Sequence, residues 1–275
     1  MNSFSSQIID ALHYAFIQRA ILAGVLIALC CSFLGIFLVL RRFSLIGDGL
    51  AHVSFAAIAL GLLLKQSPLL ISVPIVVVAS LLIFRMTEKS VMYGDAAIGL
   101  LSAVGIAVGV TLASISGGFN VDIFSYLFGN ILSISKEEIV LTVILSAIVI
   151  FSVLFFYHDL FAVSFDNDNA KVMGVKTSRV NYVLLMLTSL TVVLGIKVVG
   201  TMLVSSLIIF PAVSALQIAR NFKAAILFAS ILAILSVLIG IAVSYVFDLP
   251  AGATIVEVNF TFFVLAFLAR RLFKL

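Results

Sequence analysis

Asp48 and His52 are the residues whose types and spacing best suit chemistry in this chain. They lie four residues apart in the stretch RRFSLIGDGLAHVSFAAIALG. On a helix, this spacing places the carboxylate and the imidazole on one face, one turn apart. Both groups are ordinary ligands for Zn²⁺, Mn²⁺ or Fe²⁺, but one pair supplies only two of them. A two-fold dimer would supply four, so we expect a metal-transit site; a structural hydrogen bond between the two side chains is the alternative.

The apolar surroundings of this pair make its presence costly. An Asp at the centre of a membrane span costs about 2.5–3.5 kcal/mol on insertion scales. If helix follows directly after Arg42, Asp48 lies roughly 9 Å and His52 roughly 15 Å beyond it, near the bilayer midplane. The neighbouring residues are small, which allows close approach of helices or leaves room for a pathway. These neighbours are Gly47, Gly49, Ala51, Ser54, Ala56, Ala57 and Gly61.

Two further acidic residues, Asp122 and Glu257, also fall in apolar surroundings. Each is a candidate pore or gate residue, because ionisable groups inside a membrane bundle often line a pathway. For Asp122, the alternative is that it caps a helix. For Glu257, the alternative is that it pairs with a neighbouring helix.

The composition requires lipid as the solvent for most of the chain. Of 275 residues, 64% are hydrophobic and 10% are charged, whereas soluble domains carry about 25% charged residues. The net charge of +4 does not indicate a nucleic-acid partner, since Lys and Arg gather in cytoplasmic loops of membrane proteins. We therefore expect contact with membrane lipid and no nucleic acid. The adjacent Cys30 and Cys31 are expected to be small packing residues rather than half of a disulfide framework.

Long charge-free runs recur along the chain, and about 20 such residues suffice for a helix to cross the hydrocarbon core. They predict an all-α fold, a polytopic transmembrane helix bundle that forms a single domain over residues 1–275. About nine spans are expected, together with a re-entrant or interfacial helix at 119–135. The spans are placed near 16–40, 47–65, 68–87, 91–114, 138–157, 182–198, 201–219, 223–247 and 251–269.

The distribution of Lys and Arg predicts the direction of these spans. With the N-terminus outside and the C-terminus in the cytoplasm, the cations collect on the inner side, as the positive-inside rule requires. If residues 119–135 were counted as a full span, every later loop would change sides and this asymmetry would be lost.

One polar loop, at about 158–181, is longer than the others and is predicted to be cytoplasmic. It contains the string FDNDNAKVMGVKTSR, in which Asp166 or Asn167 is expected to cap a short helix that Gly174 ends. Such a projecting helix suits contact with a soluble partner, and an ordinary solvated loop is the alternative. The chain has no phosphate-binding GxxxxGK[ST] motif, so any ATP hydrolysis is assigned to a separate chain and this chain is not itself an enzyme.

The chain resembles the membrane subunit of metal-importing ABC transporters, a bacterial family that takes up zinc, manganese and iron. The resemblance extends over nearly the whole length. The segments that carry it read LGIFLVLRRFSLIGDGLAHVSFAAIALG, VDIFSYLFGNILSIS, FDNDNAKVMGVKTSRV, GTMLVSSLIIFPAVSALQIARNFK and DLPAGATIV.

This resemblance implies a homodimeric permease in the bacterial cytoplasmic (inner) membrane. Two ATP-binding cassette subunits would bind ATP on the inner side, and an extracytoplasmic metal-binding protein would deliver the ion. The resemblance places metal passage at Asp48 and His52, and no cofactor is expected on this chain itself. It also assigns a coupling helix that contacts the ATPase, with the residues Asp168, Ala170, Lys171, Gly174 and Val175.

Zn²⁺ is the expected cargo, with Mn²⁺ or Fe²⁺ as alternatives. The string YLFG at 126–129 and Pro211-Ala212 followed by RNFK at 220–223 resemble the zinc branch, whereas LFGN at 127–130 also occurs in manganese members. A secondary transporter is a rival interpretation that predicts inverted repeats with broken helices. An intramembrane hydrolase is a second rival, but the chain contains neither H-E-x-x-H nor G-x-S-x-G.

Overall fold

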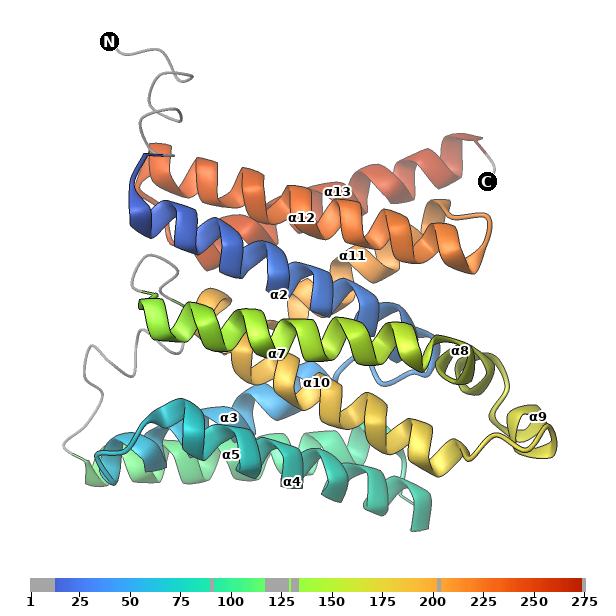
Figure 1. Ribbon diagram of the computed structural model, residues 1–275, viewed down its shortest axis with the longest axis horizontal. Helices are drawn as coiled ribbons and strands as arrows, with labels where there is room; N and C mark the ends of the chain where they lie inside the picture. The colour runs from blue at the N-terminus through green and yellow to red at the C-terminus, as the bar shows by residue number, and fades with distance from the viewer. Residues whose placement is uncertain (1–12, 90–91, 117–128, 130–133, 202–203, 274–275) are drawn as a thin grey trace.

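The structure is a computed structural model that describes residues 13–89, 92–116, 129, 134–201 and 204–273. Within these ranges every regular element is a helix, which confirms the predicted all-α class (Figure 1). The helices are α2 (Ala15–Leu40), α3 (Ile46–Leu63), α4 (Pro68–Lys89), α5 (Gly94–Ile115), α7 (Lys136–Phe155), α8 (Tyr157–Phe165), α9 (Asn167–Val172), α10 (Thr177–Val199), α11 (Val204–Ile218), α12 (Phe222–Phe247) and α13 (Ala251–Phe273).

In the described part of the chain, eight helices are long and apolar enough to cross a membrane, and α11 is a shorter apolar helix of 15 residues. These nine helices coincide with the nine predicted spans. The main difference is that α10 begins at Thr177, five residues before the predicted 182. It ends at Gly200, whose φ of 93° is readily available only to glycine. The predicted helix at 119–135 lies almost entirely outside the described residues.

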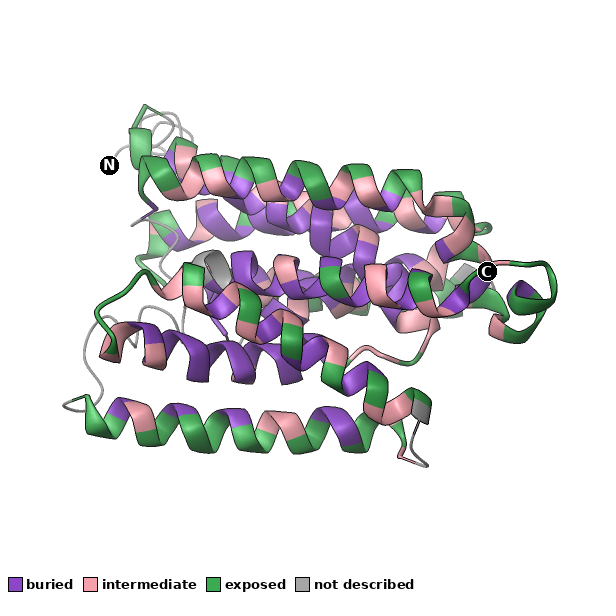
Figure 2. Cartoon of the chain, turned by 60° about the horizontal axis from the view of Figure 1, so that its bottom comes forward, coloured by how far each residue is buried: buried purple, intermediate pink, exposed green. Residues whose placement is uncertain are grey.

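Inner and outer helices differ in how far their apolar side chains are buried. Helices α2, α3 and α10 are largely buried in the bundle, whereas α5, α7 and α13 expose most of their length. Figure 2 shows buried residues concentrated in the inner helices and exposed residues along the outer ones. Beyond Lys136 and Glu137 at its start, the exposed positions of α7 are aliphatic or aromatic, as at Val140, Ile144 and Phe151, so their natural environment is lipid.

The predicted polar loop at 158–181 is more structured than the sequence suggested. The backbone breaks at Phe156 after α7 and resumes directly as α8, which leads to the six-residue helix α9. In Figure 1, α8 and α9 project from one end of the bundle. The chain therefore places a short helix beyond the spans, as predicted.

Candidate functional site

A turn between α2 and α3 sets the position of the Asp48–His52 pair. Arg42 adopts a left-handed φ of 60°, so helix does not continue from this residue and α3 begins only at Ile46. Asp48 therefore lies in the first helical turn, where the positive end of the helix favours a carboxylate. His52 is about 9 Å from the start of a helix of about 27 Å. It lies one third of the way along α3, whose start is within one residue of the predicted 47, although the helix does not follow directly after Arg42.

Asp48 and His52 are the partly exposed residues of a helix that is otherwise buried as far as Ala59, and the side of α3 on which they lie is called its open line below. Between Ile46 and Ala59, every residue except Asp48 and His52 is buried. The exposed fraction of the side chain is 46% for Asp48 and 19% for His52. The two lie on one face, as their spacing predicted, with His52 Nε2 3.6 Å from Asp48 Oδ2. This separation is within ion-pair range and slightly beyond hydrogen-bond range, and the second carboxylate oxygen is left for another ligand.

Helix α5 holds the backbone of α3 at this turn through glycine contacts. Gly105, Gly109 and Ala113 recur every four residues along α5, and all three are buried. A Cβ added to Gly105 would lie 2.9 Å from the His52 carbonyl oxygen, so only a glycine fits there. The sequence analysis did not identify this contact, although the G-x-x-x-G-x-x-x-A spacing was a visible signal.

Helix α11 contacts the opposite side of α3 near its start. A Cβ added to Gly47 would lie 3.0 Å from Ile208 Cδ1 and 3.4 Å from Ser205 Oγ. The buried hydroxyls of Ser205 and of Ser54 on α3 have no hydrogen-bond partner in the described part of the chain. Buried hydroxyls without a partner are uncommon, and these two lie on the helix that carries the pair and on a helix packed against it. Neither serine was assigned a role from the sequence.

In the part of the chain that the structure describes, no third His, Cys, Asp or Glu side chain joins the Asp48–His52 pair. Across the residues that the structure describes, no group of three His, Cys, Asp or Glu side chains could hold a metal ion. The candidate gate residue Glu257 lies exposed on α13 and joins no such group. Asp122, the other candidate gate residue, lies outside the described residues, so both gate assignments stay predictions.

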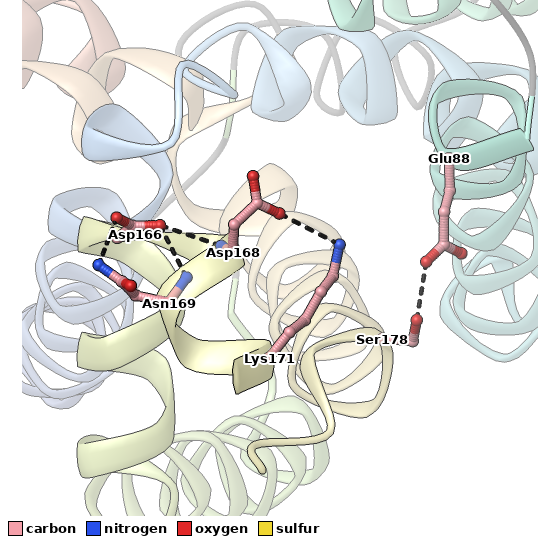
Figure 3. A network of polar contacts seen from close by, with 6 residues as sticks. All are labelled: Glu88, Asp166, Asp168, Asn169, Lys171 and Ser178. Carbon is pink, nitrogen blue, oxygen red and sulfur yellow. Dashed lines mark hydrogen bonds and ion pairs between the residues drawn. The ribbon is translucent and has the colours of Figure 1, made fainter. Parts of the chain in front are cut away.

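The short helix predicted after Asp166 is present as α9, and Asp166 caps it. Its carboxylate accepts hydrogen bonds from the backbone N–H of Asp168 and of Asn169, each at 3.0 Å, and from Asn169 Nδ2 at 2.8 Å. Figure 3 shows these contacts together with the 3.5 Å approach of Lys171 Nζ to Asp168 Oδ1. Gly174 follows the helix with a φ of 86°, the conformation that ends helices.

The predicted contact residues of this helix fall into two groups. Asp168, Lys171 and Gly174 are exposed and available to a partner. Ala170 is 2% exposed and packs into the hydrophobic core of the chain, so its side chain faces inward, and Val175 is half-buried against the same core. Val172 and Met173, which the sequence analysis passed over, are 88% and 80% exposed and present apolar side chains to the surroundings.

Two contacts connect the segment around α9 to the spans. The ring of Phe222, the first residue of α12, packs against aromatic rings of α8 and α2. Its centroid lies 4.8 Å from that of Phe161 and 5.9 Å from that of Phe165, both on α8, and 5.5 Å from that of Phe37 on α2. At the start of α10, Ser178 Oγ donates to Glu88 Oε1 of α4 at 2.7 Å (Figure 3). A displacement of α9 that moves its neighbours α8 and α10 would therefore reach α2, α4 and α12.

Known proteins are similar to this chain in sequence, and a solved structure is also similar to it in fold. The model of the ABC 3 transport family matches residues 13–270. The manganese transport system membrane protein MntC of Halalkalibacterium halodurans is 30% identical over 256 residues, which cover 93% of this chain and 88% of that protein. The high-affinity zinc uptake system membrane protein ZnuB of Haemophilus influenzae is 28% identical, covering 91% and 96%. The solved structure of PsaBC from Streptococcus pneumoniae in complex with Fab superposes with a TM-score of 0.86 at 28% identity, covering 95% of both chains.

Proposed function

The chain belongs to the ABC 3 transport family, and from that premise we propose that it is the membrane permease of an ATP-driven importer of a divalent transition metal. Relatives of similar identity are named for manganese and for zinc transport, which supports this class of cargo. Within the class we propose Zn²⁺, on the sequence strings that resemble the zinc branch, with Mn²⁺ or Fe²⁺ as the alternative.

The observation that carries the proposal is the Asp48–His52 pair on the open line of α3. An imidazole and a carboxylate that lie 3.6 Å apart on one helix face can both turn to an ion. Two ligands from one chain bind an ion weakly, and weak binding suits passage because an ion must also leave. A second copy of the chain, facing the first across a two-fold axis, would complete a transient set of four ligands.

Separate ATP-binding cassette subunits are proposed to contact the exposed side of α9. This chain has no phosphate-binding motif of its own, and the exposed Val172 and Met173 give a soluble partner an apolar surface. The contacts through Phe222 and Ser178 supply a route from α9 to the spans. An extracytoplasmic metal-binding protein is proposed to deliver the ion at the opposite end of the bundle.

Reconstitution of the permease with its ATPase chains and binding protein in liposomes tests the proposal. Uptake of Zn²⁺, Mn²⁺ and Fe²⁺ would be measured with and without ATP. We expect ATP-dependent uptake that falls about tenfold or more in His52→Ala, since even groups that only support metal ligands act on this scale. His158→Ala, a histidine at the start of α8, is the matched control and should transport normally. Uptake that is unchanged in His52→Ala would refute the assignment of the site, and uptake driven by an ion gradient without ATP would refute the transporter class.

A further inference from the structure

A groove of about 410 Å³ lies between α2 and α7, at the end of the bundle opposite α9. Its walls are two helical stripes with the spacing of a single face. Helix α2 contributes Ala15, Gln18, Arg19 and Leu22, and helix α7 contributes Lys136, Ile139 and Val140. The groove shares no residue with the Asp48–His52 site or with α9.

Helices α2 and α7 run side by side in the same direction, so the groove has a polar end and an apolar continuation (Figure 1). Arg19 Nη1 donates to the Ile134 carbonyl at 3.2 Å near the start of both helices. Further along, Cys30 Sγ lies 3.8 Å from the Ser146 carbonyl, which keeps the same register between the two helices. The side chains beyond the polar end are therefore fixed relative to the two cations.

Cations are scarce at this end of the helices. If the spans are counted along the chain, this end carries only Arg19, Lys65, Lys136 and Lys197. Two of the four line one groove although they are far apart in sequence. Lys136 is the first residue of α7 and Arg19 is the fifth of α2, close to the depth at which a phospholipid phosphate lies next to a spanning helix.

The groove turns apolar immediately beyond these cations. Leu22 is 47% exposed and Val140 is 58% exposed, and the same stripe of α7 continues through the exposed Val143 and Ile144. Exposed aliphatic side chains on a membrane helix require acyl chains as their neighbours. A ligand that satisfies both parts has an anionic head and a hydrocarbon tail.

We propose that this groove is a binding site for an anionic phospholipid, with its phosphate between Arg19 and Lys136 and one acyl chain along Leu22 and Val140. Inorganic phosphate shares the head chemistry but would leave the apolar part of the groove unused. A partner protein could cover the groove, yet it would have no need of the aliphatic stripe that continues down α7. The site is independent of the ion that the chain transports.

The absence of tryptophan from the chain gives a direct assay, because one introduced tryptophan is the sole indole fluorophore. Leu22→Trp places it in the groove. Ile239→Trp places a control at a similar depth on the exposed face of α12. Each protein is reconstituted in vesicles of equal phosphatidylglycerol and phosphatidylcholine, with bromine on the acyl chains of one lipid at a time to quench fluorescence.

We expect brominated phosphatidylglycerol to be enriched about fivefold or more over phosphatidylcholine at residue 22, since each cation near an anionic lipid favours it by about this factor. No preference is expected at residue 239. Arg19→Gln with Lys136→Gln should abolish the enrichment, and Lys65→Gln, an exposed lysine at the same end, should retain it. If the double variant fails to fold, Lys136→Gln alone should still reduce the enrichment severalfold.

Three results would overturn the proposal. The first is equal quenching by both lipids at residue 22. The second is an enrichment that survives both charge removals. The third is a loss of the quenching by brominated phosphatidylglycerol at residue 22 when inorganic phosphate is added, while quenching at residue 239 stays unchanged. That result would identify a free anion as the occupant.

Discussion

Gly105 of α5 lies so close to the backbone of His52 that a Cβ on this glycine would be 2.9 Å from the His52 carbonyl oxygen and 2.8 Å from the Val53 amide nitrogen. Backbone atoms cannot move aside as the end of a flexible side chain can. The position of the imidazole on α3 is thus set by a residue on another helix that has no side chain of its own.

Gly105→Ala should displace α5 from α3 and reduce metal uptake severalfold. The extra methyl group is an overpacking change of about 1–3 kcal/mol, partly offset by the higher helix propensity of Ala. Gly99→Ala is the matched control on the same helix, because nothing lies within 4 Å of its added Cβ. Uptake assays and thermal unfolding in detergent would compare the two. Equal effects of both substitutions would show that the contact at His52 has no special role.

Asp166→Ala should weaken the association of the ATPase chains with this permease. The substitution removes the cap of α9, which typically stabilises a helix by about 1 kcal/mol, and three hydrogen bonds are lost together. Asp168→Ala, also on this segment, keeps the cap of α9 and removes an exposed pair with Lys171, so it should weaken the association less. Co-purification of the tagged ATPase with each variant measures the difference. An Asp168→Ala effect as large as that of Asp166→Ala would show that the charge at 168, rather than the fold of α9, binds the partner.

Gly174 offers a test of backbone conformation without a packing effect. Its φ is 86°, and an added Cβ would meet nothing within 4 Å. Gly174→Ala should therefore reduce ATP-dependent uptake through strain of about 1 kcal/mol. Gly174→Asn should retain more activity, because Asn tolerates the left-handed region better than Ala does. If Asn is the more damaging of the two, the surface itself contacts the partner at this position.

Much of this arrangement follows from properties that a single stretch of sequence contains. The nine apolar runs, the shared face of Asp48 and His52, and the capped helix after Asp166 are local features, and the structure shows each of them. The start of α3 at Ile46 is within one residue of the predicted 47. The left-handed conformation of Arg42, which separates α3 from α2, was not predicted because it has no signature in that residue type. The roles of Gly105 and Phe222 depend on which helices become neighbours, which a local pattern does not specify.

The direction of side chains on α9 shows the same limit. Ala170 fits the coupling segment by position, but its methyl group packs into the core of this chain rather than toward solvent. A helix of six residues is too short for its apolar period to reveal which face is covered. The apolar residues that face outward, Val172 and Met173, were therefore not distinguished from those that face inward.

Cys30 and Cys31 should not react with water-soluble maleimides in the folded protein. Both thiols are free, and both residues are 0% exposed. Labelling should become complete for both only after denaturation in detergent, as a mass shift of the intact chain would show. Single cysteines introduced at exposed positions such as Val172 should label fully under native conditions. Native labelling of Cys30 or Cys31 would mean that α2 separates from its neighbours during the labelling time.

Phe222→Ala should separate ATP hydrolysis from metal uptake. Phe222 is the common neighbour of aromatic rings on α8 and α2, so its removal weakens the contact between the spans and α8, the helix that leads to α9. Because the ring is half-buried, the loss of stability should stay below the roughly 3–5 kcal/mol of a fully buried Phe. Phe228→Ala, an exposed aromatic on the same helix, is the control. The amount of metal transported per ATP hydrolysed should fall in Phe222→Ala and not in Phe228→Ala. An unchanged ratio in both variants would mean that another contact connects α9 to the spans. The Ser178–Glu88 hydrogen bond would then be the next contact to remove.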